Sequence, residues 1–347
     1  MLVAMMVVTG TLASPALLAR TPRARTAAST TPAPEPTRIP LAMGISLIEG
    51  NTARSDDDLD ALDAFAARSG RMPASFSIWS DWGGDNSAFP SRALLSGLRG
   101  RGVRPVIFWQ PVGKDWRTRP ERYAYERIVA GDWDAYLTAW ARDAAAWGDR
   151  VIVRWAHEMN APWFPWAIGK VGNTPEGYRA AWRHVVTLVR GIAPNVRFMW
   201  APNAPCGTCV AYADLFPGDA SVDLVGFDIY AWKPGDLAPM VELYRPAMLE
   251  LRALTALPVV VAETGAAGPS DARAAWLSEG LPAIAEAYPE LVGFIYFDID
   301  MRVTDDPDWR LSEDDGTLEA WATLAADPPA AGILDPTPEE LAALPTP

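Results

Sequence analysis

The sequence predicts a (β/α)8 barrel, a closed ring of eight parallel strands surrounded by helices. Eight short apolar runs of strand type recur from residue 41 onward, and each is followed by a stretch with apolar residues three and four positions apart. Alternating strands and helices imply parallel pairing through right-handed crossovers, and eight such units fit a closed barrel. An open doubly wound sheet usually has a glycine-rich phosphate loop after its first strand. The corresponding segment, GISLIEGNTARSDDD, is not such a loop.

The eight expected strands begin with LAMGISLI and end with LVGFIYF. In chain order they span residues 41–48, 73–79, 104–109, 151–156, 196–201, 222–230, 258–263 and 291–297. The stretches between them, such as WDAYLTAWARDAAAWG and TPEGYRAAWRHVVTLVRGIAP, have helical periodicity. Asp56 and the pair Thr174–Pro175 are helix start signals in two of these stretches.

The predicted barrel domain covers residues 41–327, and the flanking segments differ from it in composition. Residues 1–19 form an apolar run of signal-peptide length with no charge before Arg20, so we expect a signal peptide or an N-terminal membrane anchor. Residues 20–40 are typical of a Pro-, Thr- and Ala-rich linker, and residues 328–347 of a Pro-rich tail. We therefore expect a monomer that is secreted or held at the cell surface.

Charge and composition exclude some partners. The chain has 43 acidic and 30 basic residues, a net charge of -13, which argues against nucleic acid and anionic membrane surfaces because both need clustered Lys and Arg. Sixteen tryptophans are present, and an indole face suits a sugar ring as well as a core. Cys206 and Cys209 are the only cysteines. A lone CxxC cannot form a four-cysteine zinc site, so we expect a disulfide that closes a small loop.

Polar and aromatic residues gather at the predicted strand ends, where the active site of this fold lies. They are Glu49, Trp79, Asp81, Trp82, Trp109, Gln110, His157, Glu158, Asn160, Trp200, Asn203, Asp228, Tyr230, Trp232, Glu263, Asp298 and Asp300. Carboxylates surrounded by tryptophans predict a site for carbohydrate.

Two of these residues have the placement that glycoside hydrolysis needs, which is a pair of carboxyl groups flanking one bond. Glu158 follows the fourth strand and Glu263 ends the seventh, so they face one another across the barrel mouth. Either glutamate alone could be a helix-cap neighbour or half of a salt bridge, but the pair favours catalysis. Because side chains alternate along a strand, we expect Val259 and Val261 to share the face of Glu263.

The same alternation places Arg154 on the inward face with Glu158. An unpaired arginine inside a barrel is costly, so we predict that Arg154 meets Asp228 or Glu263. Alternation points His157 away from the barrel axis, and a bulge at the strand end would be needed to turn it toward the site.

Metal sites are not expected. HEMN resembles the start of the zinc motif HExxH, but the position of the second histidine is Ala161. The other histidine, His184, lies in a predicted helix. The acidic segment after the last strand, DIDMRVTDDPDWRLSEDDG, lacks the spacing of an EF-hand and is typical of a solvated loop.

Three motifs resemble glycoside hydrolase family 26. They are HEMNAPWFPW after the fourth strand, FDIYAW after the sixth and VVVAETG on the seventh, and the resemblance spans about residues 41–325. The family comprises retaining endo-β-glycanases, mostly β-mannanases, with the catalytic glutamates on strands four and seven. The resemblance implies that Glu158 is the acid/base and Glu263 the nucleophile. It also implies that Tyr230 hydrogen-bonds the nucleophile and that Trp163 forms an aromatic platform on the leaving-group side.

The remaining motif residues are assigned less sharply. His157 would contact the sugar or orient Glu158, and Asn160, Phe164 and Trp166 complete the motif. Two positions depart from the family. Pro165 interrupts an aromatic run that often reads WFWW, and the eighth strand ends in FIYFDID where the wider clan commonly has Trp, leaving Phe297 or Tyr296 for that place.

The sequence therefore predicts an exported retaining endo-β-glycanase that needs no metal or cofactor and acts by double displacement. β-1,4-Mannan is the first expected substrate, with mixed-linkage β-1,3-1,4-glucan and β-1,3-xylan as alternatives. A non-catalytic glycan-binding barrel and a surface scaffold are the alternatives of another class. The predicted polar substrate contacts are His157, Asn160, Asn203 and Tyr230. The predicted aromatic contacts, of which we expect about half to be exposed to substrate, are Trp79, Trp82, Trp109, Trp163, Trp166, Trp200 and Trp232. The predicted supports of the nucleophile are Tyr230, Arg154 and Asp228.

Overall fold

The computed structural model describes residues 41–47, 56–233, 237–326 and 334. The predicted signal peptide or anchor, the linker, Glu49 and, apart from Leu334, the C-terminal tail lie outside the described residues. Among the residues that are described, no helix combines the length and the hydrophobicity that a membrane span requires.

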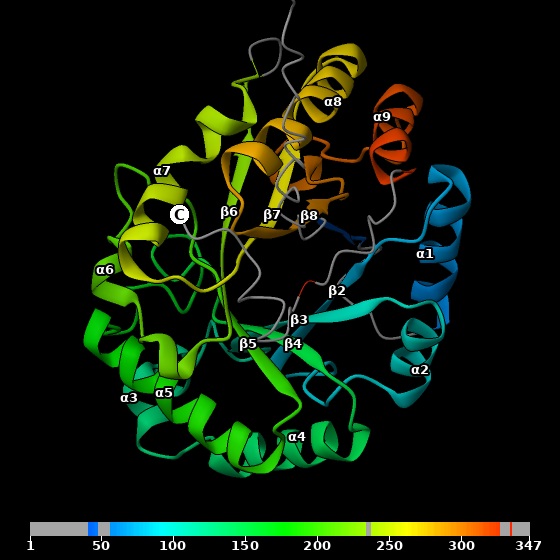
Figure 1. The fold of residues 1–347 in the computed structure, drawn as a ribbon. Coiled ribbons are helices and arrows are strands. Elements are labelled where there is room, and N and C mark those ends of the chain that lie inside the picture. Colours follow the sequence, from blue (N-terminus) through cyan, green and yellow to red (C-terminus); the bar gives the residue numbers. More distant parts are fainter. Residues whose placement is uncertain (1–40, 48–55, 234–236, 327–333, 335–347) are drawn as a thin grey trace, which may run out of the picture. The chain divides into compact units, whose positions relative to one another are not determined.

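The described part of the chain contains eight strands that close into a barrel in chain order, which confirms the predicted fold class (Figure 1). All neighbouring strands pair in parallel, and β1 closes the ring against β8. The strands are β1 (Ala42–Ser46), β2 (Ser75–Gly83), β3 (Arg104–Gly113), β4 (Val151–Trp155), β5 (Val196–Trp200), β6 (Leu224–Ala231), β7 (Val259–Ala266) and β8 (Leu291–Phe297).

Helices follow the strands and pack outside the barrel (Figure 1). The α-helices are α1 (Asp56–Ser69), α2 (Arg92–Gly100), α3 (Tyr125–Val129), α4 (Asp134–Trp147), α5 (Pro175–Ile192), α6 (Tyr212–Leu215), α7 (Met240–Leu254), α8 (Ser270–Ala287) and α9 (Asp315–Ala326). The 3-10 helices are η1 (Pro120–Tyr123), η2 (Asp219–Ser221) and η3 (Arg302–Thr304). Helix α5 begins as predicted, because Thr174 caps it by accepting a hydrogen bond from the amide of Gly177.

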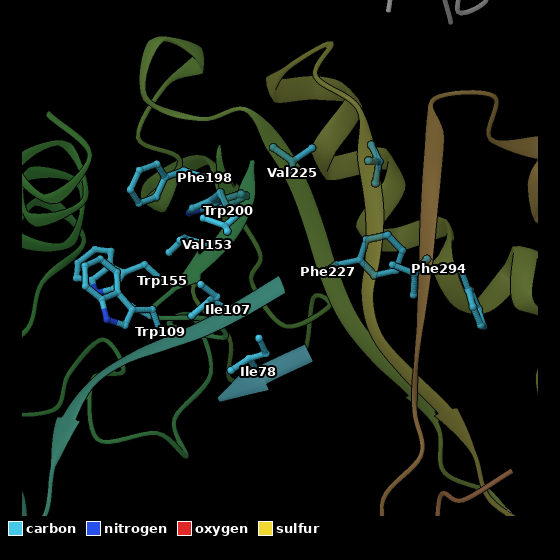
Figure 2. Packing of buried hydrophobic residues seen from close by; sticks show 14 of the residues in the cluster. Ile78, Ile107, Trp109, Val153, Trp155, Phe198, Trp200, Val225, Phe227 and Phe294 are labelled. Carbon is cyan, nitrogen blue, oxygen red and sulfur yellow. The ribbon is translucent and has the colours of Figure 1, made fainter. Parts of the chain in front are cut away.

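Side-chain alternation along the strands divides the core into two layers. An inner cluster takes residues from seven strands, including Phe108, Ile152 and Val260, and fills the barrel. The residues between them, such as Ile107 and Val153, join side chains from the helices in an outer cluster (Figure 2). This layering is the usual way in which a barrel interior is packed solid, so a site must lie at the strand ends.

Strand β7 departs from regular alternation just before its end. Phe227 and Asp228 are consecutive in β6, yet they pair with Val261 and Glu263 of β7, which leaves Ala262 as an extra residue. The pairing of β7 with β8 also shifts over the same residues. This is a β-bulge, which bends a strand and redirects the side chains that follow it.

Candidate active site

The bulge corrects one sequence prediction about the strand that carries Glu263. Val259 and Val261 were expected on the face of Glu263, but both pack in the outer, helix-facing cluster. Val260 and Ala262 belong to the inner cluster instead. The bulge places Ala262 and Glu263 in succession toward the barrel axis. Glu263 therefore reaches the site, although regular alternation after Val259 and Val261 would turn it toward the helices.

Arg154 connects two carboxylates at the centre of the barrel mouth, as predicted. It is fully buried, and its two terminal nitrogens donate to Asp228 Oδ2 and Glu263 Oε1. Its guanidinium also lies 4.5 Å from the ring centroid of Phe108. Burial by itself would lower the pKa of Arg154, but the charges of its two carboxylate partners, with that of Glu158, outweigh burial and raise it. Arg154 therefore holds a fixed positive charge beneath the carboxylates.

Both oxygens of Glu263 accept hydrogen bonds. Arg154 donates to Oε1, and the hydroxyl of Tyr230 donates to Oε2 at 2.7 Å. The side chain is buried, with 5% of its surface exposed. Two donors on one carboxyl group fix the direction of its oxygens, and this is the arrangement of a carboxylate that must act from one defined position.

Glu158 lies on a strained turn directly after β4. Ala156 and Glu158 have φ angles of 47° and 50°, a left-handed conformation that is uncommon for residues other than glycine. The amide of Ala156 donates to the carbonyl of Trp109 at 3.1 Å, and that of Glu158 to the carbonyl of Ala201 at 3.0 Å. Because neighbouring strands hold both residues, the turn persists and directs Glu158 toward the mouth.

The acidity of Glu158 is strongly perturbed. Burial, reinforced by the charge of Glu263, raises the pKa of Glu158 to about 7. Arg154 and a hydrogen bond from Trp163 Nε1 to Oε2, 2.5 Å long, act in the opposite direction. A carboxyl group with this pKa can hold a proton near neutrality and then release it, as a general acid and base must.

A third carboxyl group completes the cluster. Glu158, Asp228 and Glu263 each offer an oxygen, and these three atoms lie within 4.8 Å of one another. Burial raises the pKa of Asp228 well above its usual range, although Arg154 opposes this. Three carboxylates could also hold a cation, but Arg154 already pairs with two of them, so the site has the charge balance of an ion-pair network. The absence of a metal stays a prediction.

His157 faces the inner aromatic residues, and the expectation that it points outward is wrong. Its ring centroid lies 5.7 Å from that of Trp79 and 5.6 Å from that of Phe108, which belongs to the inner cluster. The positive φ angles on either side of it provide the reversal for which a bulge was thought necessary. Burial, with the charge of Arg154, lowers the pKa of His157 well below its usual range. The imidazole is therefore neutral near pH 7.

The predicted tryptophan contacts separate into two groups. Trp163 and Trp232 are half exposed, at 53% and 50%, and Trp79 is partly exposed. The other four cannot offer a face to a sugar, because they are buried: Trp82, Trp109, Trp166 and Trp200. Trp109 stacks on Trp140 of α4, and the indole of Trp166 donates to the carbonyl of His157.

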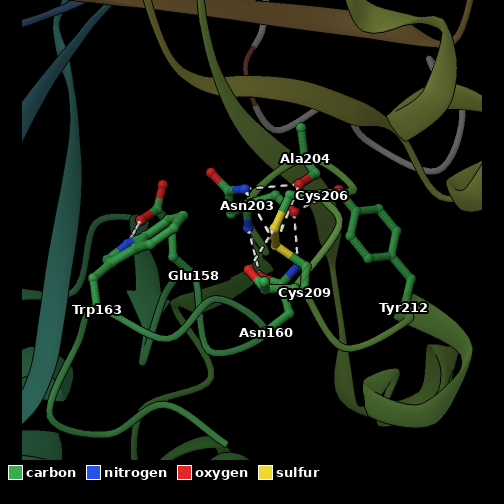
Figure 3. The surroundings of a disulfide bond; sticks show 9 residues. Glu158, Asn160, Trp163, Asn203, Ala204, Cys206, Cys209 and Tyr212 are labelled. Atoms are coloured by element: carbon green, nitrogen blue, oxygen red, sulfur yellow. Dashed lines mark hydrogen bonds between the residues drawn. A yellow bond between two sulfur atoms is a disulfide. The ribbon is translucent and has the colours of Figure 1, made fainter.

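The asparagines hold the strand ends together, and the role of Asn160 in substrate binding stays a prediction. Asn160 Nδ2 donates to the carbonyl of Asn203 at 2.8 Å, and the amide of Asn203 donates to Asn160 Oδ1 at 2.9 Å. The side chain of Asn203 is also occupied, because its Nδ2 donates to the carbonyl of Ala204. A disulfide joins Cys206 and Cys209 in the same loop (Figure 3). This loop therefore braces the turn that carries Glu158.

The sequence reasoning missed Trp309, which lies in the acidic loop after β8. Its ring centroid is 4.7 Å from that of Tyr230 and 4.9 Å from that of Trp232. The signal available in the sequence was a single large aromatic residue within DIDMRVTDDPDWRLSEDDG. A tryptophan is an unusual choice for a loop that is solvated throughout.

Comparison with known proteins identifies a family that this part of the chain resembles. The model of glycosyl hydrolase family 26 matches residues 120–273, which contain Glu158, Tyr230 and Glu263. Over this segment the chain is similar to glycosyl hydrolase family 26. A catalytic domain of the family from a Bacillus species, described as an endo-β-1,4-mannanase, superimposes with a TM-score of 0.61 at 18% identity, over 83% of this chain and 86% of that one. At this identity the superposition supports the fold alone.

Family 26 members of different specificity resemble the chain to a similar degree. It is 30% identical to endoglucanase H of Acetivibrio thermocellus over 227 residues, which are 62% of this chain and 23% of that protein. It is 29% identical to a mannan endo-1,4-β-mannosidase of Bacillus subtilis over 161 residues, which are 44% of this chain and 40% of that protein. The chain thus matches less than half the length of either relative.

Proposed function

We propose that the chain is a retaining endo-β-glycanase, with Glu158 as acid/base and Glu263 as nucleophile. The observation that carries the proposal is the carboxyl cluster at the barrel mouth, in which oxygens of Glu158 and Glu263 lie within 4.8 Å. Retaining glycosidases have carboxyl groups about 5–5.5 Å apart, whereas inverting enzymes leave about 6.5–9.5 Å for a water molecule. The short separation supports direct attack by Glu263.

In the first step, a Glu263 oxygen attacks the anomeric carbon and forms a glycosyl ester. The glycosidic bond breaks, and Glu158 gives its proton to the departing oxygen. Tyr230 and Arg154 hold Glu263 in position for the attack. The pKa of about 7 keeps Glu158 protonated below neutrality, as this step requires.

In the second step, water attacks the anomeric carbon and the ester bond breaks, which restores the carboxylate of Glu263. Glu158 accepts the proton of the water. Esterification removes the charge of Glu263 and with it one cause of the raised pKa of Glu158, so the group becomes a better base when a base is needed. The indole N–H of Trp163 then stabilises the Glu158 carboxylate.

The first proposed substrate is β-1,4-mannan, supported by the 29% identity to a mannan endo-1,4-β-mannosidase over 161 residues. Mixed-linkage β-1,3-1,4-glucan is the second candidate, supported by the 30% identity to an endoglucanase over the longer match. β-1,3-Xylan is a third. The exposed tryptophans Trp163 and Trp232 are the proposed stacking surfaces for sugar rings.

Reducing-end release from these three polymers tests the proposal. We expect the wild-type chain to release sugar from one of them and Glu158→Gln to lose that activity by several orders of magnitude. Glu176→Gln is the matched control, because Glu176 is a mostly exposed side chain on α5. NMR of the first product should show the anomer of the substrate. Inversion, or full activity of Glu158→Gln, would overturn the mechanism.

We further propose that the protein works outside the cytoplasm. The Cys206–Cys209 disulfide supports this, since disulfides persist mainly in oxidising compartments. The apolar run of residues 1–19 is consistent with an export signal or anchor. Expression of the full chain in a bacterial host, followed by fractionation and N-terminal mass determination, tests this. Recovery of activity in the cytoplasm alone would contradict it.

A further inference from the structure

We infer that Trp309 is a positioning residue, which holds Trp232 in place and thereby determines how a sugar is held beside Glu263. This inference rests on the proposed function and extends it to the loop between β8 and α9. Trp309 lies beyond residue 273, where the family match ends. It is 2% exposed, so it offers no face to a substrate and acts through its neighbours.

Trp309 touches both residues on the nucleophile side of the site. Its indole meets that of Trp232 edge to face, with ring centroids 4.9 Å apart and an interplanar angle of 90°. Its ring centroid also lies 4.7 Å from that of Tyr230. Trp232 is half exposed, whereas Tyr230 donates its hydroxyl to Glu263. One buried ring therefore supports a candidate sugar platform and a contact of the nucleophile.

The strand behind Trp309 fits the flat ring closely. A Cβ atom added to Gly265 would lie 3.0 Å from the indole atom Cε3, so a side chain there would have to displace the ring. Phe297 at the end of β8 meets Tyr230 at 5.6 Å with an interplanar angle of 89°. The indole is thus held between the backbone of β7 and the aromatic residues at the mouth.

Backbone contacts fix the segment that carries Trp309. Its amide donates to the carbonyl of Ile299 at 3.1 Å, and its carbonyl accepts from Nη2 of the buried Arg273 at 3.3 Å. Asp300 and Asp308 form an antiparallel bridge at the same place. The loop therefore folds back on itself directly beside Trp309.

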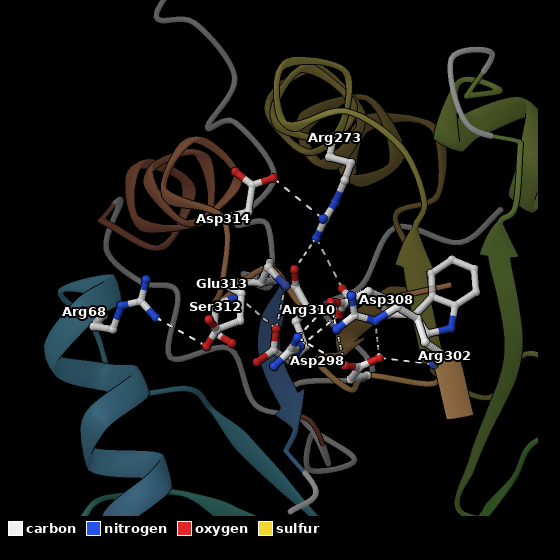
Figure 4. A network of polar contacts seen from close by, with 12 residues as sticks. Arg68, Arg273, Asp298, Arg302, Asp308, Arg310, Ser312, Glu313 and Asp314 are labelled. Atoms are coloured by element: carbon white, nitrogen blue, oxygen red, sulfur yellow. Dashed lines mark hydrogen bonds and ion pairs between the residues drawn. The ribbon is translucent and has the colours of Figure 1, made fainter. Parts of the chain in front are cut away.

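Ion pairs reinforce this fold on both sides of the bridge. The sequences DIDMR and DPDWR each place an arginine two residues after an aspartate, and these pairs interlock (Figure 4). Arg302 and Arg310 each pair with Asp300 and Asp308, at distances from 2.5 to 3.4 Å. The expectation of a solvated loop is thus correct for these charged side chains and wrong for Trp309, which is buried.

Asp298 anchors the other end of the loop. Its buried carboxylate accepts from the amides of Leu311 and Ser312 at 2.6 and 2.9 Å. Trp309 lies two residues before this clamp. A ring held by its own backbone, by the bridge and by the contacts of Asp298 has little freedom. It can therefore fix the position of Trp232, which is half exposed.

A double-mutant cycle tests the inference, with the polymer that the wild-type chain hydrolyses as substrate. We expect Trp309→Leu to raise KM by about two- to tenfold, the range for one aromatic pair. Trp309→Phe should restore most of the loss, because it keeps one ring. In a Trp232→Ala background, Trp309→Leu should raise KM by less than about twofold, since the platform that it positions is gone.

The control is Trp321→Leu, which removes an equally buried tryptophan on α9 that packs against Phe65 and Tyr296. It should lower thermal stability and leave KM unchanged. An unchanged KM in Trp309→Leu, or the same rise in both backgrounds, would overturn the inference. If Trp309→Leu does not fold, Trp309→Met, which also removes the ring, is compared with Trp321→Met. A wild-type chain inactive on all three polymers would count against the proposed function instead.

Discussion

The hydrogen bond from Trp163 to Glu158 leads to a prediction about how the activity depends on pH. The indole donates to the ionised carboxylate at 2.5 Å and so lowers the pKa of Glu158, which burial has raised to about 7. Trp163→Phe keeps an aromatic face for the sugar but removes the donor. The pKa of Glu158 should therefore rise, and the variant should stay active at higher pH than the wild type.

The size of the shift follows from the strength of the lost bond. Hydrogen bonds to charged groups contribute about 1.5–3 kcal/mol, and the lower end applies here because Trp163 is 53% exposed and water replaces part of the contact. About 1.5 kcal/mol corresponds to about one pKa unit. We therefore expect the alkaline limb of kcat/KM against pH to move from about 7 to about 8.

The assay is kcat/KM on one soluble polymer over pH 4 to 10. Trp232→Phe is the matched control, because Trp232 is equally exposed and contacts Tyr230 and Trp309 rather than Glu158. It should raise KM without moving the alkaline limb. An alkaline limb of Trp163→Phe that stays in place or moves to lower pH would refute the assignment of Glu158 as the titrating acid.

Three further predictions concern stability. Arg154→Met leaves two buried carboxylates without their counter-charge and should lower the free energy of unfolding in urea by about 3–5 kcal/mol. Glu158→Gln should stabilise the protein by up to about 3 kcal/mol at pH 8 and by little at pH 4. The pKa of Glu158 is about 7 in the folded state and 4.5 in the unfolded state, so ionisation of this group costs stability as the pH rises between these values. Equal stability of wild type and variant at pH 8 would contradict this prediction. Reduction of the Cys206–Cys209 disulfide, which closes a very short loop, should cost about 2 kcal/mol in a thermal or urea titration.

Local sequence patterns predicted the barrel and its central ion pair well. Each expected strand overlaps an observed one, because a buried parallel strand is a short apolar run that chain neighbours alone can indicate. Arg154 was also predictable, since alternation places it inward and the cost of burying a charge demands a partner. Both inferences use only the chain near the residue and a general energetic rule.

The buried tryptophans were not predictable by the same means. Trp109 and Trp200 stand at strand ends beside the expected site, but their parity directs them outward, where α4 and the residues around α6 cover them. Their burial depends on helices and loop residues that follow them in the chain. For Trp309 the error was the opposite one, because a buried residue was assigned to a solvated loop. Its neighbours in the sequence are charged, whereas the residues that pack against it are Gly265, Tyr230 and Trp232.

The two catalytic candidates share a physical feature that strand alternation cannot produce. A regular strand presents every second residue to the barrel axis, yet His157 and Glu158 both face inward, as do Ala262 and Glu263. The chain achieves this with positive φ angles after β4 and with a bulge in β7. Both departures cost free energy locally, and they persist because adjacent strands hold them. The positions of the glutamates are therefore a property of the closed barrel, and no segment of the chain would adopt them alone.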